Sequence, residues 1–228
     1  MNKVVVVFLS ILVKWSVLLA QPTNFLIGYQ ASTLLTPSRY FQVIDYEYQI
    51  QYGITKKGFR LSPLFDGISY GLYIQALDNF GINVIHYRKV STSNVAEFPN
   101  KEFAQYKMIL KSWGVGCTFR EENPKFGVDF EFGRLTLKKK KYPEAEFKKG
   151  KWVDYCPTVE FLGKGPIYLG MNIYLMYRWK FIELRPYLSW IPGVEQYPDY
   201  SGIGISYYTF KLSTIGLATY LVLGNKND

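Results

Sequence analysis

Cysteine and histidine are scarce in this chain. Its 228 residues include two cysteines and one histidine. One imidazole and two distant thiols do not form the ligand cluster of a zinc site, so we expect no bound metal and no cofactor. Nucleophilic catalysis needs a base within hydrogen-bond reach of the nucleophile, and Ser69 and Ser112 have the opposite strand parity to His86, the only histidine. The composition therefore argues against a metalloenzyme and against a serine hydrolase.

Long apolar runs are also absent beyond the N-terminus. Residues 4–13 are apolar, follow Lys3 and precede the small residue Ala20, an order that is typical of a secretion signal. We therefore predict a signal peptide over residues 1–20 and a mature domain over residues 21–228. The alternative is an uncleaved anchor, which we disfavour because Lys14 interrupts a run that would need about 20 apolar residues.

The chain is basic and rich in aromatic residues. Its net charge is +9, and it has 20 Tyr and 16 Phe. A basic, aromatic composition is compatible with nucleic-acid binding. The predicted export of the protein disfavours nucleic-acid binding. In addition, the aromatic residues fall within and near the ends of strand-like segments. They therefore indicate aromatic belts at a membrane interface, with membrane lipid as partner and no nucleic acid.

Residues 67–76 show the clearest pattern in the chain. Ile68, Tyr70, Leu72 and Ile74 alternate with small or polar residues. Strand side chains alternate between two faces, so this segment has one apolar face and one small or polar face. A turn at residues 77–79 then leads into a second arm over residues 80–87.

Eight such arms can be marked, and their connections alternate in length. The arms cover residues 25–34, 67–76, 80–87, 105–119, 126–137, 167–178, 181–190 and part of 202–223. The short connections are 77–79, 121–125 and 179–180, and the long ones are 35–66, 89–104, 138–165 and 191–201. Short periplasmic turns alternating with long outer loops are typical of outer-membrane barrels. We predict an all-β protein, an eight-stranded antiparallel up-and-down transmembrane β-barrel.

Four places fit this scheme poorly. Residues 38–51 predict a short helix in the first outer loop, with a ninth strand as the alternative. The eighth arm loses its alternation between Tyr207 and Ile215, which suggests a bulge, an extension above the membrane, or a turn at residues 211–214. Pro186 predicts a bulge in the seventh arm, because proline removes a ladder donor. Lys107 and Lys111 either face lipid near the outer rim, where they would meet lipid phosphates, or mark a bulge that shifts the register.

Charged residues of both signs fall on the predicted inner face. They are Asp129, Glu131, Glu183 and Arg185. Unpaired charges there would be costly, so we expect a paired, barrel-interior polar cluster that plugs the lumen. A gated proton or ion path is the alternative, which we disfavour because eight strands leave space only for side chains. Gly114 and Gly116 suggest small inward residues that make room for bulky partners across the lumen.

His86 and the two thiols complete the list of reactive groups. Ser69 and Ser112 have the opposite strand parity to His86, so we expect no catalytic site. Cys117 lies near a turn and Cys156 in a loop at the other end of the barrel. A disulfide requires Cα atoms within about 7 Å, so we predict two free thiols.

A run of lysines makes the third outer loop basic. We considered contacts with the phosphates of outer-leaflet glycolipid beside the simpler interpretation of a solvated loop. The candidate residues are Lys139, Lys140, Lys141, Lys148 and Lys149.

Three segments resemble the PorT-type outer-membrane β-barrels of the Bacteroidota, within the broader OmpA-like class. They are Phe-Leu-Ile-Gly-Tyr-Gln at 25–30, Tyr-Phe-Gln-Val-Ile-Asp at 40–45 and Gly-Ile-Ser-Tyr-Gly-Leu at 67–72. The resemblance covers essentially the whole mature chain and implies location in the cell outer membrane. We expect a non-enzymatic barrel without a substrate pore, with a structural, adhesive or complex-associated role alongside other envelope proteins. A membrane-embedded lipid-modifying enzyme and a soluble calycin-like lipid-binding barrel are the alternatives.

Overall fold

The computed structural model describes residues 23–35, 62–93, 96–97, 102–119, 123–143, 151–154, 167–196 and 207–224. The predicted signal peptide lies outside the described residues, as do the predicted helix or ninth strand at 38–51, Cys156, Lys148 and Lys149. No helix capable of crossing a membrane occurs in the described part of the chain.

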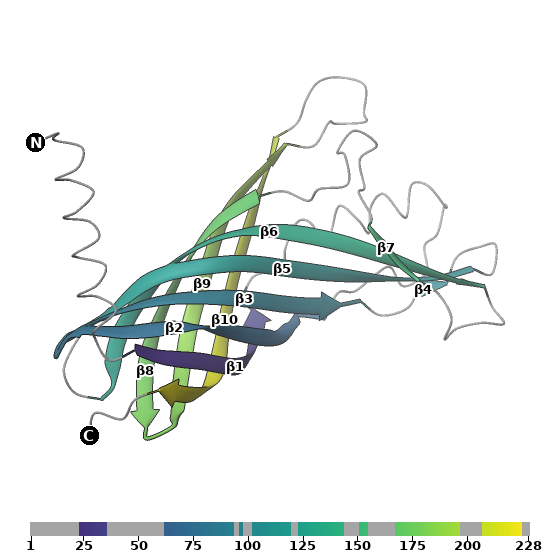
Figure 1. Cartoon of the computed structure of the whole chain (residues 1–228). Helices are drawn as coiled ribbons and strands as arrows, with labels where there is room; N and C mark the ends of the chain where they lie inside the picture. Colours follow the sequence, from purple (N-terminus) through teal and green to yellow (C-terminus); the bar gives the residue numbers. More distant parts are fainter. Residues whose placement is uncertain are drawn as a thin grey trace, which may run out of the picture.

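Eight long antiparallel strands form the wall of a closed barrel (Figure 1). They are β1 (Thr23–Leu34), β2 (Leu64–Leu77), β3 (Phe80–Thr92), β5 (Glu102–Phe119), β6 (Lys125–Pro143), β8 (Ile167–Trp179), β9 (Ile182–Gln196) and β10 (Tyr207–Gly224). β1 pairs with β10, and β5 pairs with β6, so no edge is left in the wall. Two short strands, β4 (Ala96–Glu97) and β7 (Trp152–Asp154), pair with the beginning of β5 and with the last part of β6, respectively. The predicted eight-stranded antiparallel barrel is confirmed.

The register fixes how far the strands are staggered. We start at Leu223 on β10 and step from each residue to its partner on the next strand. After one circuit of the wall the path returns to β10 at Ser213, ten residues from its start. The path passes through Phe25, Leu72, Val84, Val115, Phe130, Met171 and Trp190. Such a stagger requires tilted strands, typically by about 35–45°, and eight strands leave an interior that side chains can fill.

The two ends of the barrel differ. At the turn end, short connections join β2 to β3, β5 to β6 and β8 to β9, and Asn24 pairs with Gly224. At the loop end, β5 and β6 continue past the end of β3 (Figure 1). Residues 138–143, predicted as part of a loop, belong to β6 and pair with β5. That prediction was wrong because cross-strand pairing maintains the strand where alternation has ended.

The bulge predicted at Pro186 is wrong, and at two other places the structure decides between the predicted alternatives. The register of β9 with β8 and with β10 is the same on both sides of Pro186, so there is no bulge at this residue. β10 is one strand without a turn at residues 211–214. The pairings of β5 are continuous through Lys107 and Lys111, so both residues stay on the outward face. The register shift that does occur lies between Gln75 and Leu77.

The faces of the wall follow the predicted alternation. Outward positions carry large exposed apolar side chains all around the barrel, for example Phe130 at 67% and Leu169 at 64% exposure. Inward positions carry buried tyrosines, polar or charged residues, and some apolar side chains such as Leu26, Ile85 and Met176. The barrel is thus apolar on its outer face, and its charged groups are concentrated inside.

Inward glycines make room for tyrosine rings of the neighbouring strand. In four cases the glycine and the tyrosine are directly paired: Gly28–Tyr220, Gly127–Tyr174, Gly133–Tyr168 and Gly216–Tyr187. A Cβ at Gly127 would lie 2.2 Å from Cζ of Tyr174. Gly114 likewise lies beneath Tyr87, which is on the adjacent strand β3 and not across the lumen as predicted.

Replacing Gly127 with alanine should therefore destabilise the barrel by about 1–3 kcal/mol, the usual cost of overpacking. The Tyr174 ring cannot retreat easily because its hydroxyl bonds to Asp129 at 3.1 Å. Urea unfolding of the lipid-reconstituted protein measures the change. Gly170→Ala is the matched control, because the closest atom to its new Cβ is on the flexible side chain of Ile191, at 3.1 Å, and its next contacts are at the ordinary distances of 3.4 and 3.6 Å. Equal effects of the two substitutions would contradict the ring-packing explanation.

Candidate functional site: the charged barrel interior

The four residues predicted to share the interior are all buried there. Asp129 and Glu131 project from β6, and Glu183 and Arg185 project from β9, each no more than 2% exposed. They lie in strand positions two residues apart, so each pair faces the lumen from one strand. The structure joins them into three connected groups, each centred on one carboxylate.

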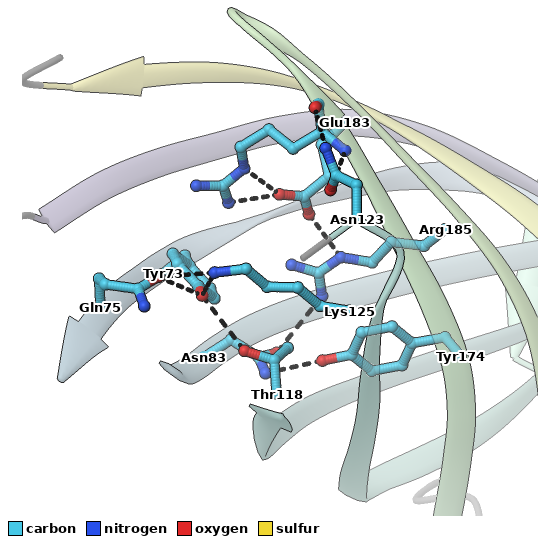
Figure 2. Close-up of polar contacts among 10 residues, drawn as sticks. Tyr73, Gln75, Asn83, Thr118, Asn123, Lys125, Tyr174, Glu183 and Arg185 are labelled. Atoms are coloured by element: carbon cyan, nitrogen blue, oxygen red, sulfur yellow. Dashed lines mark hydrogen bonds and ion pairs between the residues drawn. The ribbon is translucent and has the colours of Figure 1, made fainter. Parts of the chain in front are cut away.

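Glu183 lies nearest the turn end and is held by two arginines. Arg185 Nε donates to its Oε1 at 2.5 Å, and Arg178 Nε donates to Oε2 at 2.7 Å. Arg178 Nη2 also donates to Oε2. The backbone of Arg178 is in turn held by Asn123, whose side chain both donates to and accepts from it (Figure 2). Both oxygens of Glu183 are therefore satisfied by cationic donors.

Asp129 is held by tyrosines rather than by a direct ion pair. Tyr87 donates to it at 2.6 Å and Tyr174 at 3.1 Å. Asn83 donates to the Tyr174 hydroxyl at 2.9 Å and accepts from Arg185 at 3.4 Å, which links this group to the Glu183 group (Figure 2). The Arg185 guanidinium also lies over the Tyr174 ring, 4.7 Å from its centroid.

Glu131 lies toward the loop end and has donors from three other strands. Lys89 Nζ lies 3.1 Å from Oε1, and Ser112 Oγ donates to Oε2 at 2.9 Å. Asn172 also donates to Oε1, and Tyr168 lies 3.5 Å from Oε2. Lys89 sits between the rings of Tyr87 and Tyr187, 5.3 Å from each centroid. Lys89 is itself 3% exposed, so this is a buried ion pair.

A fourth polar group lines the wall at the turn end. The Tyr73 hydroxyl donates to Gln75 at 2.8 Å and lies 3.2 Å from the Thr118 hydroxyl. Lys125 donates to Gln75 at 3.0 Å (Figure 2). The Arg178 guanidinium lies 4.4 Å from the Tyr73 ring centroid, so this group adjoins the Glu183 group.

The charges of the three carboxylate groups balance. Asp129, Glu131 and Glu183 face Lys89, Arg178 and Arg185, giving three anions and three cations. A cavity beside Arg185 and Asn172 has room for about one water molecule. Four of its lining residues carry a buried polar atom without a hydrogen-bond partner among the described residues: Gln30, Asn172, Arg185 and Tyr187. The three carboxylate groups are therefore neutral in sum, and the cavity beside them has space on the scale of a single water molecule.

Sequence reasoning missed Lys89, the direct partner of Glu131. The predicted third arm ends at Tyr87, so Lys89 falls in a predicted loop. The structure extends β3 to Thr92. The inward parity of Gly81, Asn83, Ile85 and Tyr87 continues to Lys89 and was the available signal.

His86 lies on the outward face, away from the polar interior. Its ring stacks on Tyr70 with centroids 4.9 Å apart and meets Trp113 edge-on at 5.1 Å. Ser69 and Ser112 are buried inside, and the Ser112 hydroxyl bonds to Glu131. The structure therefore does not bring His86 together with either serine. Within the described residues, no group of three potential ligand residues could hold a metal ion.

Of the five predicted lysine contacts, the structure describes the side chains of Lys139 and Lys140, which lie on opposite faces of β6. Lys139 has inward parity on β6, and its Nζ lies 5.3 Å from the Tyr106 ring centroid. Lys140 has outward parity, and only the backbone of Lys141 is described. Cys117, on the outward face of β5, carries a free thiol.

No family model and no curated protein matches the sequence. Solved structures of other barrels are similar in shape. The attachment invasion locus protein Ail of Yersinia pestis aligns with a TM-score of 0.44 and 11% identity, over 89% of this chain and 99% of Ail. Neisserial surface protein A aligns with a TM-score of 0.44 and 9% identity, over 86% and 96%. The outer membrane protease OmpT of Escherichia coli aligns with 0.37 and 10%, over 90% and 97%. At these identities the similarity concerns the fold alone.

Proposed function

We propose that this chain is a plugged β-barrel of a bacterial outer membrane that has a non-enzymatic, structural, adhesive or complex-associated role. The observation that carries the proposal is the reversed polarity of a closed barrel, apolar outside and charged inside. The predicted kinship with PorT-type barrels of the Bacteroidota is part of this proposal. Its partners are membrane lipid and other envelope proteins.

The apolar outer face supports a lipid environment. Contiguous apolar surface of this extent is rare on proteins that face water. Closure of the wall satisfies every strand's backbone groups, which lipid demands. An outward apolar band with a polar interior is the arrangement that spans outer membranes.

A soluble lipid carrier of the calycin type is contradicted by the same faces. Such a barrel would bury Ile68 and Leu72 in its cavity. The two residues are 54% and 44% exposed on the outward face. The interior positions of the same strand carry Ser69 and Tyr73, each 0% exposed.

The charged interior supports the absence of a substrate pore. Each buried carboxylate is bonded to side chains from other positions of the wall, so the lumen is occupied by the protein itself. We expect no unitary conductance when the protein is reconstituted in planar bilayers. Stable single-channel steps from folded protein would overturn the plugged-barrel proposal.

Membrane location is tested by fractionation. We expect the protein in the outer-membrane fraction, with faster gel mobility before heating than after it, because closed barrels resist detergent unfolding. Recovery as a soluble periplasmic protein without heat-dependent mobility would reject the proposal. The Gly127→Ala variant should show the same location with a lower transition temperature.

A further inference from the structure

Three basic side chains lie next to one another on the outward face of β3, β5 and β6. Arg88 pairs with Lys111, and Lys111 pairs with Arg134. All three side chains are exposed. We name this row the basic ladder. Lys107 and Lys138, which pair directly, continue it four residues farther toward the loop end.

The ladder places like charges directly opposite each other twice. Such pairs destabilise an antiparallel sheet unless something compensates the charge. The described carboxylates do not form an ion pair with any of the three. Asp66, a diagonal neighbour of Arg88 on β2, accepts a hydrogen bond from Tyr29 on its other side. The positive charge of the ladder is thus not compensated by an ion pair with any carboxylate among the described residues.

Aromatic residues on the same outward face indicate how deep the ladder would lie in the membrane. The row directly beneath it contains Tyr70, His86 and Trp113, which contact one another. Tyrosine and tryptophan gather where hydrocarbon meets headgroups. A second aromatic row, Phe80, Phe119 and Phe126, lies at the turn end, six residues from the first aromatic row and eight residues from the ladder. Eight residues of a tilted strand cover about 20 Å of membrane normal, close to the height of the apolar band.

We infer that the basic ladder binds the phosphate groups of outer-leaflet glycolipid. The inference rests on the proposed membrane location, which puts the ladder at the level of the lipid headgroups. Neighbouring strands are about 4.8 Å apart, so side chains from two strands can reach one phosphate. Arginine at both ends of the row supplies paired N–H donors that match phosphate oxygens. This assigns the lipid contact to a row different from the five lysines predicted for it.

The test compares lipid binding by three reconstituted proteins: the wild type, Arg88→Gln/Lys111→Gln/Arg134→Gln, and the control Lys151→Gln/Lys180→Gln. The control removes exposed positive charges away from the ladder. Each protein is first checked for heat-dependent gel mobility. Binding is then measured by retention of phosphorylated glycolipid from mixed vesicles, with dephosphorylated glycolipid as the second arm.

We expect the ladder variant to retain phosphorylated glycolipid at least about tenfold less than the wild type, and the control to retain it equally. Wild-type retention of the dephosphorylated glycolipid should fall to the level of the variant. Equal retention by the folded ladder variant, or equal retention of both glycolipids by the wild type, would overturn the inference. Failure of the wild type to enter vesicles would instead overturn the proposed function. A ladder variant that does not fold is replaced by Lys111→Gln alone, with an intermediate loss expected.

Discussion

Replacing Glu183 with alanine should destabilise the folded barrel by about 3–5 kcal/mol, the range measured when one partner of a buried ion pair is removed. Glu183 is fully buried and is the shared acceptor of Arg178 and Arg185. Its loss leaves the buried guanidinium of Arg185 without a carboxylate partner. Urea unfolding in lipid vesicles, followed by tryptophan fluorescence, measures the change.

One further variant separates the contribution of the Glu183 charge from that of its hydrogen bonds, and a second variant serves as a control. Glu183→Gln keeps an acceptor oxygen but removes the charge, so we expect a smaller loss of stability than with alanine. Asp78→Asn removes an exposed carboxylate in the β2–β3 turn and should change stability by no more than about 0.5 kcal/mol. If Glu183→Ala behaves like Asp78→Asn, the interior network does not contribute to folding as described.

The fold was predictable because both faces of a barrel strand restrict which side chains they accept, so the sequence must alternate. Lipid-facing positions such as Ile68 must be apolar, and positions such as Ser69 must fit a crowded interior. Above the apolar band this constraint ends, and the prediction fails at the same point. The lysines at 138–140 resemble a loop in sequence, yet pairing with residues 105–107 keeps them in β6.

The interior site was predictable by residue but not by partner. Inward parity identified Asp129, Glu131, Glu183 and Arg185 without any knowledge of register. Which groups they touch depends on how eight strands are staggered, and a single strand's sequence does not encode that. Asp129 illustrates the point, because Tyr87 and Tyr174 reach it from strands that are 42 and 45 residues away.

Interior and exterior charges have different roles in this barrel. Inside, each carboxylate has donors within the chain, and the charges balance. Outside, the basic ladder repeats one sign across three strands. A structural plug explains the balanced charges inside the barrel. It gives no reason for the row of like charges on the outer face. The exterior is therefore where we place the interaction with a partner.

The Lys89–Glu131 pair provides a second large and distinctive effect. Glu131→Leu removes the carboxylate that is ion-paired with buried Lys89, and should cost about 3–5 kcal/mol. The double variant Lys89→Met/Glu131→Leu should recover much of that loss, because buried pairs replaced by apolar residues are often close to neutral. Recovery will be incomplete, since the side chains of Ser112 and Asn172 also lose their acceptor.

Comparison of the single and double variants decides whether the pair acts as a unit. Coupling requires the double variant to lose less stability than Lys89→Met and Glu131→Leu lose in sum, all measured by the same unfolding assay. Strictly additive losses would mean that Lys89 gains its stability elsewhere, for example from the rings of Tyr87 and Tyr187. Because Lys89 on β3 and Glu131 on β6 lie on the two strands that flank β5, coupling would also demonstrate that the network joins strands that do not pair directly.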